Sequence, residues 1–258
     1  MTRKATVIGW PIKHSKSPVI HSYWLAEHGI DATYEKTAVA PQELEAWTQT
    51  AWDEGLTGFN ATIPHKVSLM KFVEADIVAT SIGAINTVFR GQNGWLGTNT
   101  DAAGWWSSLG LKNPPKNALI IGAGGAAKAI IYALVRQGTN LTITNRTKEK
   151  ADALGFKVID WKGTSIDGRG FDLIVNSSAC GMNNSNSLTF TNLDPGCVVS
   201  DLVYSPLKTE FLRSAADLGG VPIDGIGMLL HQAANSFEKW FGVKPAITNE
   251  LKEHVLAS

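Results

Sequence analysis

Residues 118–127 read Ala-Leu-Ile-Ile-Gly-Ala-Gly-Gly-Ala-Ala, a short apolar run followed by a turn rich in glycine. The apolar run predicts a buried strand over 118–121, and the pattern after the turn predicts a helix over 128–137 that ends at Gly138. A second strand is expected over 141–144. Strand, helix and strand in this order form a βαβ unit, in which the two strands run parallel.

The turn itself matches the spacing G-x-G-x-x-G/A, with Gly122, Gly124 and Ala127 at the three fixed positions. Inside a βαβ unit this spacing is typical of a dinucleotide site. The first glycine allows the tight turn, the second lets the backbone approach the pyrophosphate, and the third small residue lets helix and strand pack closely. The free N–H groups at the helix start suit the phosphates. We therefore expect five turn residues to bind the cofactor: Gly122, Ala123, Gly124, Gly125 and Ala126.

The residues after the second strand indicate which dinucleotide binds. NAD sites place an Asp or Glu here for the ribose 2′-hydroxyl, whereas NADP sites place cationic and polar groups for the 2′-phosphate. In this sequence Arg146 and Lys148, with the polar groups of Asn145 and Thr147, follow the strand and suit a 2′-phosphate, and no carboxylate occurs before Glu149. The sequence therefore predicts NADP(H) as the cofactor, held through Asn145, Arg146 and Thr147.

Composition excludes several classes of protein. The chain has 258 residues, enough for one large or two modest domains, and 44% of them are apolar, which excludes a disordered chain. The 23 basic and 23 acidic residues balance, so the charge that nucleic-acid or anionic-membrane binding needs is missing. No apolar run approaches the ~20 residues of a membrane span. With only Cys180 and Cys197, we expect neither a disulfide framework nor a metal site, and a cytoplasmic location.

Strand and helix patterns alternate along the rest of the chain. The expected strands are 6–9, 32–39, 56–61, 84–89, 95–97, 157–159, 173–175 and 198–200, and the expected helices are 18–27, 41–53, 65–73, 101–109, 210–218 and 228–240. Such alternation predicts an α/β protein with parallel sheets. Asn93-Gly94 is a hairpin-turn dipeptide. The helix-breaking run 113–115, Asn-Pro-Pro, suggests two domains with a boundary near 101–115.

Two hydroxyl groups lie near the start of the first predicted helix. Ser17 is well placed as the N-cap and Pro18 as the first helical residue, and this local role is enough to explain both. Together with Ser15, however, Ser17 would also form a neutral receptor for a small carboxylate. The local pattern leaves both interpretations open and favours the cap.

Two charged residues follow predicted strands. Lys66 comes soon after the strand 56–61, and Asp101 follows the strand 95–97. Each has an ordinary explanation, because most lysines lie on the surface and an aspartate often caps a helix. The carboxyl ends of strands in an α/β sheet nevertheless line the ligand crevice. A lysine and an aspartate that arrive from two such ends would form an acid–base pair.

Eight motifs in this order resemble those of the shikimate dehydrogenase family, and they extend over nearly the whole chain: 15–18, 58–66, 84–87, 99–101, 122–128, 145–147, 201–204 and 225–232. The chain departs from the family at Ala61, where valine is usual, and at 176–180, Asn-Ser-Ser-Ala-Cys, where a Thr-Pro-type turn is common. One match is modest evidence, whereas eight in order are highly specific.

The resemblance implies NADP-dependent, reversible reduction of 3-dehydroshikimate to shikimate, a step of the chorismate pathway of aromatic amino acid biosynthesis. It implies that Lys66 and Asp101 are the catalytic pair and that Ser15 and Ser17 bind the substrate carboxylate. Four further residues would contact the ring and its hydroxyls: Thr62, Asn86, Tyr204 and Gln232. Three would lie beside the nicotinamide: Leu202, Gly225 and Met228.

The resemblance also implies the domain organisation. An N-terminal α/β substrate domain with a mainly parallel sheet would comprise residues 1–101 and 227–258, because Gln232 must reach the substrate. A Rossmann-like NADP-binding domain would comprise residues 102–226, with a cleft between the two domains. The expected partner is a small-molecule substrate, without nucleic acid or membrane, in a monomer or homodimer.

Three alternative functions remain open at this stage. The nearest is a quinate/shikimate dehydrogenase with relaxed substrate or NAD use, against which Ser17, Arg146 and Thr147 argue. The second is a non-catalytic sensor that binds NADP or a shikimate-like ligand, and the presence of both Lys66 and Asp101 argues against it. The third is a related NADP-binding fold that acts on a folate.

Overall fold

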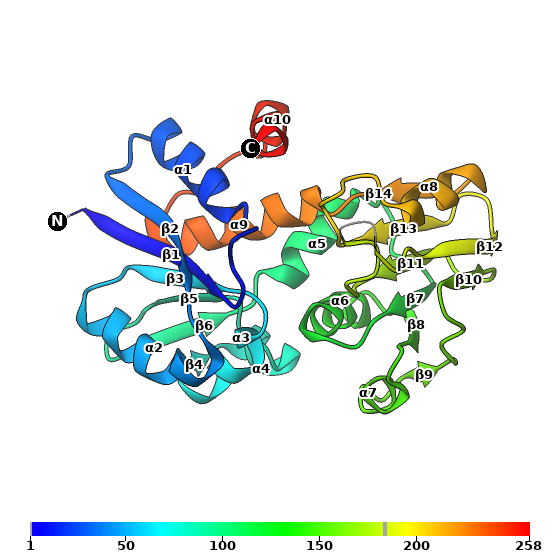
Figure 1. The fold of residues 1–258 in the computed structure, drawn as a ribbon, viewed down its shortest axis with the longest axis horizontal. Coiled ribbons are helices and arrows are strands. Elements are labelled where there is room, and N and C mark those ends of the chain that lie inside the picture. The colour runs from blue at the N-terminus through cyan, green and yellow to red at the C-terminus, as the bar shows by residue number, and fades with distance from the viewer. Residues whose placement is uncertain (1, 183–184) are drawn as a thin grey trace. The chain divides into compact units, whose positions relative to one another are not determined.

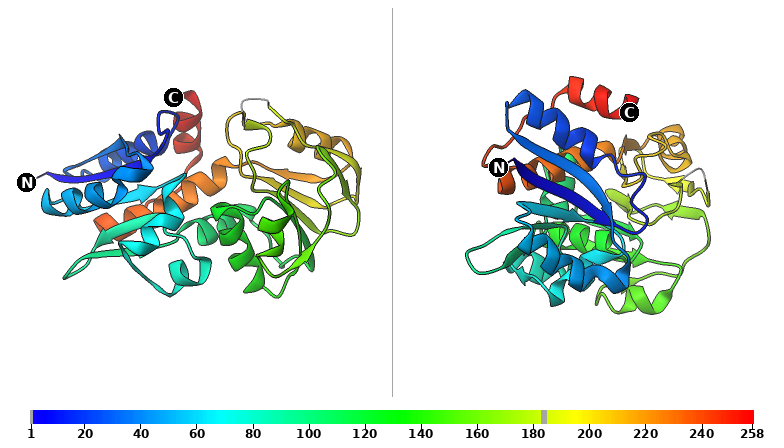
Figure 2. Two further views of the ribbon diagram at one scale, coloured as in Figure 1. Left: turned by 60° about the horizontal axis from the view of Figure 1, so that its bottom comes forward. Right: turned by 60° about the vertical axis from the view of Figure 1, so that its left-hand side comes forward.

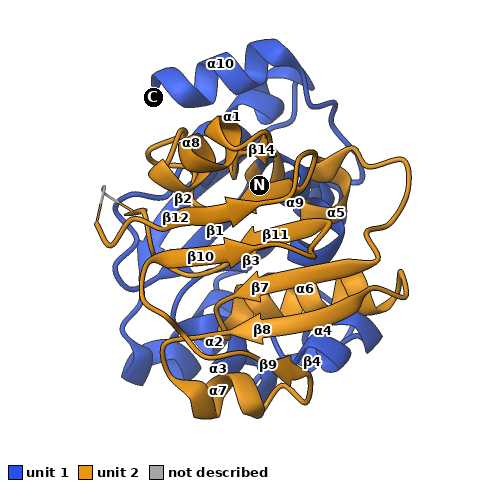
Figure 3. Cartoon of the chain, turned by 90° about the vertical axis from the view of Figure 1, so that its right-hand side faces the viewer, with its two compact units in different colours: residues 1–104, 230–258 blue, residues 105–229 orange. Residues whose placement is uncertain are grey.

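The computed structural model describes residues 2–182 and 185–258 (Figure 1). The chain forms two compact units, unit 1 with residues 1–104 and 230–258, and unit 2 with residues 105–229 (Figure 3). It passes from one unit to the other inside two helices, α5 (Asp101–Leu109) and α9 (Ile226–Phe241). Each unit contains its own six-stranded sheet. The predicted α/β class is thus confirmed. The ligand of each unit and the cleft between the domains stay predictions.

The sheet of unit 1 has the order β2-β1-β3-β5-β6-β4. Its strands are β1 (Arg3–Gly9), β2 (Ala32–Ala38), β3 (Gly58–Ala61), β4 (Glu74–Ala75), β5 (Thr87–Arg90) and β6 (Trp95–Thr98). β1 runs parallel to β2 and β3, and β4 runs parallel to β6. Only β5 is antiparallel to its neighbours, because the predicted hairpin at Asn93-Gly94 reverses the chain before β6.

Helices cover both faces of this sheet. They are α1 (Ser17–Glu27), α2 (Leu44–Asp53) after the turn η1 (Pro41–Glu43), α3 (His65–Ser68) with η2 (Leu69–Lys71), and α4 (Ile77–Ile82). The last helix, α10 (Asn249–Ala257), packs on α1 (Figure 1). α1 lies on one face and α2 on the other (Figures 1 and 2). On the α2 face, Leu44 and Ala51 pack against Ile8 and Phe59 in a buried apolar cluster. β3 is buried along its whole length and β1 from Ala5 onward, as expected for strands that are covered on both faces.

Several local predictions in unit 1 need correction. Helix α1 begins at Ser17, so that Lys16 is its N-cap residue and no side chain caps it; the N-cap predicted at Ser17 is wrong by one position. The strand predicted over 84–89 begins only at Thr87, because residues 84–86 form the turn before it. The sequence patterns missed α4 and α10. Both are short, and Asp76 and Thr248 accept a capping hydrogen bond at their starts.

Unit 2 contains an all-parallel sheet in the order β14-β13-β11-β7-β8-β9. Its strands are β7 (Asn117–Ile121), β8 (Asn140–Thr144), β9 (Lys157–Val158), β11 (Leu173–Asn176), β13 (Val198–Asp201) and β14 (Val221–Ile223). Its helices include α6 (Gly125–Val135), α7 (Lys148–Asp152) and α8 (Glu210–Asp217). The order reverses at β7, which is the arrangement of a doubly wound, Rossmann-like domain. The predicted class of this region is confirmed.

Two further strands, β10 (Ser165–Gly168) and β12 (Thr189–Leu193), pair with each other in a separate two-stranded sheet. They were missed because their Asp, Asn and Gly residues have low strand propensity. Helix α6 begins at Gly125, three residues before the predicted start, because Gly124 already serves as its N-cap residue. None of the helices in the described part of the chain has the length and apolar character that a bilayer span requires.

Candidate active site

The sheet of unit 1 brings four chain segments to one edge. Ile8 of β1 pairs with Ala61 of parallel β3, so both strands end together. β5 runs in the opposite direction, so its first residue, Thr87, lies at this same edge, opposite Thr98 at the end of β6. The turns that adjoin these positions carry residues 15–17, 62–66, 84–86 and 99–101. The strand order therefore gathers the predicted substrate and catalytic residues of unit 1 at one edge, except Gln232, which α9 supplies.

Lys66 and Asp101 form an ion pair at this edge. Lys66 Nζ donates a hydrogen bond to Asp101 Oδ2 at 2.5 Å, and the two side chains are 19% and 5% exposed. Asp101 is the first residue of α5, where the positive end of the helix dipole favours a carboxylate. Its backbone N–H donates to Asn99 Oδ1 at 3.0 Å, which fixes the helix start. The pair presents one partly exposed ammonium that a nearly buried carboxylate holds in place.

Asn86 holds the second oxygen of the carboxylate. Its Nδ2 donates to Asp101 Oδ1 at 2.8 Å and to Thr100 Oγ1 at 2.9 Å, while its Oδ1 accepts from the backbone N–H of Thr100 at 2.8 Å. The residue before it, Ile85, donates its N–H to the carbonyl of Lys66 at 2.8 Å. The turn of Asn86 thus ties the lysine-bearing and aspartate-bearing segments together.

Gln232 reaches the same cluster from α9. Its Oε1 lies 3.5 Å from Asn86 Nδ2, at the limit of a hydrogen bond. Helices α5 and α9 approach closely here, because a Cβ atom on Gly104 would lie 2.6 Å from the backbone nitrogen of Gln232. Gly104 was missed by the sequence analysis. A glycine inside a helix costs about 0.5–1 kcal/mol, and that cost is the signal that would have pointed to a close contact.

A buried polar layer lies next to Asn86, and the sequence analysis missed it as well. Ser236 Oγ lies 3.0 Å from Asn60 Nδ2, 2.7 Å from Thr87 Oγ1 and 3.3 Å from Thr100 Oγ1. Tyr34 donates its hydroxyl hydrogen to Asn60 Oδ1 at 2.7 Å. Burial raises the pKa of Tyr34 well above its ordinary value, so the hydroxyl remains a donor. Buried hydrogen bonds of this kind fix a single arrangement of the turns.

The remaining predicted residues of unit 1 lie at the same edge without a direct link to the ion pair in the described structure. Ser15 Oγ accepts a hydrogen bond from the backbone N–H of Ser17 at 3.3 Å. Thr62 donates its backbone N–H to the carbonyl of Ile8 at 2.9 Å, directly after β3. Tyr204 belongs to unit 2, where it follows β13, and its contact with substrate stays a prediction.

In unit 2, the carboxyl ends of four parallel strands form one row. Ile121 at the end of β7 pairs with Thr144 of β8 on one side and Asn176 of β11 on the other, and Asn176 pairs with Asp201 of β13. Ligands of doubly wound sheets bind at this edge, beside the strand where the order reverses. That strand is β7, and the glycine turn follows it directly.

The geometry of the glycine turn fits a pyrophosphate. Gly122 has φ +116°, and a Cβ there would lie 2.6 Å from Ser177 Oγ. At Gly124 and Gly125 an added Cβ would meet no atom within 4 Å, so there is open space above the start of α6. Ala127 is fully buried, as its packing role requires. The backbone N–H groups of an eleven-residue helix and this open space suit a dinucleotide phosphate.

The segment after β8 fits a 2′-phosphate. Asn145 Nδ2 donates to the carbonyl of Thr147 at 2.7 Å, which shapes the turn. Lys148 is paired with Asp152 at 2.9 Å, whereas Arg146 is exposed and has no hydrogen bond or ion pair with any described residue. The guanidinium of Arg146 therefore remains available to an anion.

The divergent loop at 176–182 is closed by its own side chains. Asn176 Nδ2 donates to Asp201 Oδ1 and to the carbonyl of Cys180, both at 2.9 Å, and Ser178 Oγ donates to Asn176 Oδ1 at 2.7 Å. Asp201 also accepts from Thr209 Oγ1 at 2.6 Å, and burial raises the pKa of its carboxyl group to about 6. These hydrogen bonds order the turn without the proline that is common there.

The predicted nicotinamide-side residues lie in two neighbouring segments of unit 2. A Cβ on Gly225 would lie 2.5 Å from the carbonyl oxygen of Leu202, so the two backbones are in close contact. Met228 follows on α9 and is half-buried. The structure therefore brings Gly225 and Leu202 together, and Met228 lies three residues after Gly225.

A chain of two α/β units, with a lysine–aspartate ion pair in one and a Rossmann-like glycine turn in the other, is typical of one class of protein, the two-unit α/β dehydrogenases. Three family models match the chain: the shikimate dehydrogenase substrate binding domain over residues 7–88, shikimate/quinate 5-dehydrogenase over 109–166, and the shikimate 5′-dehydrogenase C-terminal domain over 225–248. The shikimate dehydrogenase (NADP+) of Brucella canis is 39% identical over 276 residues, which cover 99% of this chain and 94% of its own. This chain belongs to the shikimate dehydrogenase family.

Solved structures agree with the fold. Shikimate 5-dehydrogenase from Thermus thermophilus, crystallised with NADP(H) and shikimate, matches with a TM-score of 0.90 and 29% identity over 99% of both chains. A ligand-free 5-ketofructose reductase of Gluconobacter sp. strain CHM43 matches with a TM-score of 0.91 and 27% identity over 100% of this chain and 99% of its own. Since one fold accommodates both proteins, the substrate has to be argued from the site residues.

Proposed function

We propose that this protein catalyses the reversible, NADP-dependent reduction of 3-dehydroshikimate to shikimate. The observation that carries the proposal is the ion pair of Lys66 and Asp101, whose ammonium is partly exposed at the edge where the predicted substrate residues gather. The pair lies in a chain that shares 39% identity with a shikimate dehydrogenase (NADP+). This reaction is a step of aromatic amino acid biosynthesis, so the proposal also assigns the protein to that pathway.

Lys66 acts as the general acid in the reducing direction. Its Nζ donates a proton to the substrate oxygen as the carbonyl becomes a hydroxyl, and solvent returns a proton to the amine afterwards. Asp101 accepts a hydrogen bond from Nζ at 2.5 Å, so it aims the ammonium and stabilises its charge. When bound, the reduced nicotinamide supplies the hydride that the carbonyl carbon receives. In the oxidising direction Lys66 accepts the hydroxyl proton.

The other residues of unit 1 bind and orient the substrate. The hydroxyls of Ser15 and Ser17 hold its carboxylate. Four side chains contact the ring and its hydroxyls: Thr62, Asn86, Gln232 and, from unit 2, Tyr204. Support comes from the hydrogen bond between Asn86 and Asp101 and from the short distance between Asn86 and Gln232. The substrate domain, residues 1–101 with 227–258, is proposed on this basis.

Unit 2 binds NADP(H). The turn residues 122–126 receive the pyrophosphate, with support from the open space at Gly124 and Gly125. Arg146 binds the 2′-phosphate together with Asn145 and Thr147, with support from its exposed, unpaired state among the described residues. Leu202, Gly225 and Met228 lie beside the nicotinamide. The NADP-binding domain, residues 102–226, is proposed on this basis.

The test follows the absorbance of the reduced nicotinamide in four mixtures, shikimate or quinate, each with NADP or NAD. Fast turnover only with shikimate and NADP is expected. Comparable turnover with quinate or NAD would replace the proposal with the relaxed quinate/shikimate dehydrogenase. No turnover in any mixture, with saturable binding of shikimate in calorimetry, would instead identify a non-catalytic sensor. A cytoplasmic location and a monomer or homodimer remain predictions, which cell fractionation and light scattering can check.

A further inference from the structure

Lys16 separates the two serines proposed to bind the substrate carboxylate, and its side chain is engaged elsewhere. Its Nζ donates to the backbone carbonyl of Val255 at 3.0 Å and to the carbonyl of Ser258 at 2.5 Å, and it lies 3.3 Å from Ser258 Oγ. Both acceptors belong to the last turn of α10 and the residue after it. A contact across 239 residues of sequence thus joins the carboxylate turn to the far end of the chain.

The contact has a clear physical basis. The last carbonyl groups of a helix lack partners within the helix, and they carry the negative end of its dipole. An ammonium has three donor hydrogens, and Lys16 has three oxygen atoms within hydrogen-bond distance at this helix end. No donor of Lys16 remains for a substrate. The lysine therefore caps α10 and is not itself a carboxylate ligand.

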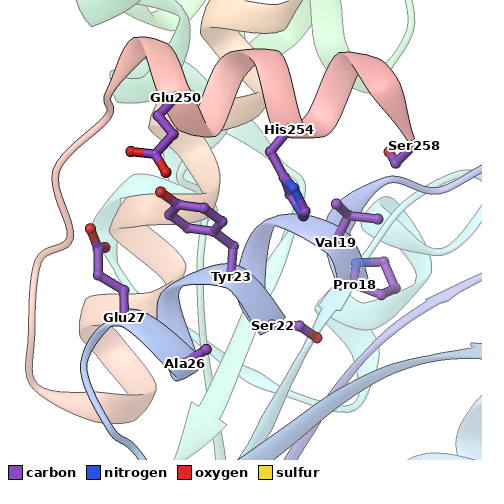
Figure 4. A pocket seen from close by; sticks show the side chains of 9 residues that line it. All are labelled: Pro18, Val19, Ser22, Tyr23, Ala26, Glu27, Glu250, His254 and Ser258. Carbon is purple, nitrogen blue, oxygen red and sulfur yellow. The ribbon is translucent and has the colours of Figure 1, made fainter.

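Much of the space between α1 and α10 is open. A groove of about 990 Å³ lies there. In Figure 4, Ser22, Tyr23 and Glu27 project from α1, and Glu250 and His254 project from α10. The ring centroids of Tyr23 and His254 are 5.4 Å apart. Lys16 makes its hydrogen bonds at the C-terminal end of α10, where Ser258 lies near Pro18 and Val19 in Figure 4.

We propose that α10, acting through Lys16, positions the turn that receives the substrate carboxylate, and that Lys16 is a positioning residue for the reaction. The inference rests on the proposed function, because it needs Ser15 and Ser17 as the carboxylate receptor. The turn has two further anchors, a hydrogen bond from the N–H of Ser15 to the carbonyl of Ile12 at 3.1 Å and one from Lys36 Nζ to the carbonyl of Lys13 at 2.7 Å. Lys16 anchors it between the two serines.

The first test is Lys16→Met, with Lys71→Met as a matched substitution of an exposed lysine in unit 1. We expect KM for shikimate to rise roughly five- to tenfold, the effect of losing one charge-assisted anchor, while kcat and KM for NADP change less than about twofold. Lys16→Arg should restore most of the affinity, since a guanidinium also donates to carbonyl groups. Unchanged KM in Lys16→Met would overturn the proposal.

A second variant separates positioning from direct binding. Deleting residues 255–258 removes the acceptors and leaves Lys16 in place. If Lys16 positions the turn, the deletion raises KM for shikimate, and adding Lys16→Met to it has little further effect. If Lys16 instead binds the carboxylate itself, the deletion frees its ammonium group and KM for shikimate does not rise. Adding Lys16→Met to the deletion then raises KM for shikimate, and this result contradicts the proposal.

Amide hydrogen exchange tests the positioning role without any measurement of turnover. Amides of residues 12–17 should exchange faster in Lys16→Met than in the unsubstituted protein or in Lys71→Met, because one anchor of the turn is lost. Equal exchange in all three proteins would overturn the positioning role. Absence of turnover with shikimate in the unsubstituted protein would instead overturn the proposed function, so the two failures are distinguishable.

Discussion

The sites of the two units are built in different ways. In unit 1 the site consists of side chains that bond to one another, with Asp101 held by Lys66 on one oxygen and by Asn86 on the other. In unit 2 it consists of backbone and empty space, with Gly124 and Gly125 facing no atom within 4 Å of an added Cβ. Arg146, an exposed cation after β8, has no hydrogen bond or ion pair with a described residue.

The difference follows from what each site has to do. Proton transfer needs a donor atom held in one position, and interlocked buried hydrogen bonds provide that position. Binding of a phosphate needs N–H groups and room, which a glycine turn at a helix start supplies. Substitutions in the cluster of Lys66, Asp101 and Asn86 should therefore lower the rate, whereas substitutions in the nucleotide turn of unit 2 should weaken cofactor binding with the rate at saturation preserved.

The largest effect is expected at Lys66. Lys66→Ala removes the proton donor, so kcat should fall roughly 10³-fold, within the range typical of general acid–base residues, with a small change in KM for shikimate. Steady-state kinetics in both directions measure it, with Lys71→Met as the surface-lysine control. A near-normal kcat would remove Lys66 from the mechanism.

The next effect concerns the stability of unit 1 in acid. His21 is fully buried and stacks on Tyr34, and burial lowers its pKa to about 3 from 6.5, an effect that Asn60 opposes only in part. The pKa of His21 is lower in the folded protein than in the unfolded chain. Its contribution to the free energy of unfolding is therefore complete above pH 6.5 and declines as pH falls toward 3. The loss at pH 4.5 is about 3 kcal/mol.

Urea unfolding at pH 7 and pH 4.5 measures this loss. Six of the nine tryptophans lie in unit 1, so their fluorescence reports mainly on that unit. In His21→Leu the decrease in unfolding free energy between the two pH values should be smaller than in the unsubstituted protein by about 3 kcal/mol. Equal decreases in both proteins would show that His21 is not the group that titrates.

A smaller effect is expected at Arg146 in unit 2. Arg146→Ala should raise KM for NADP roughly thirtyfold, the loss of about 2 kcal/mol of charge-assisted hydrogen bonding, while kcat at saturating NADP and the KM for NAD stay nearly unchanged. Lys150→Ala on the following helix is the control for a general loss of positive charge. An equal loss for NAD and NADP would show that Arg146 does not recognise the 2′-phosphate.

The smallest effect is expected at Gly124. Gly124→Ala places a methyl group in the open space, so KM for NADP should rise roughly tenfold while unfolding free energy changes by less than about 0.5 kcal/mol. Gly122→Ala is the contrast, because its positive φ and its contact with Ser177 should destabilise the protein by about 1–3 kcal/mol. Thermal unfolding and NADP titration separate the two, and similar stability losses in both variants would contradict this distinction.

Local sequence pattern was sufficient for the βαβ unit and its glycine turn, whereas Asn86, Tyr204 and Gln232 were predicted only from the family resemblance. The βαβ unit lies within residues 117–144. Its strands, glycine turn and helix contact one another over short distances in sequence, so the local pattern is enough to predict them. The polar residues at strand ends were found because parallel strands end at one edge. The same patterns placed the starts of α1 and α6 incorrectly, since helix starts depend on single residues.

Tertiary structure alone decided which of these residues meet. The reversal of β5 places Asn86 beside Asp101, the close approach at Gly104 brings Gln232 to the same cluster, and Lys16 reaches α10. Ser236 joins Asn60 across 176 residues of sequence. Periodicity reports which face of an element is buried, but it does not report which other element covers that face. Strand order and helix packing determine that, because they depend on the apolar burial of the whole chain.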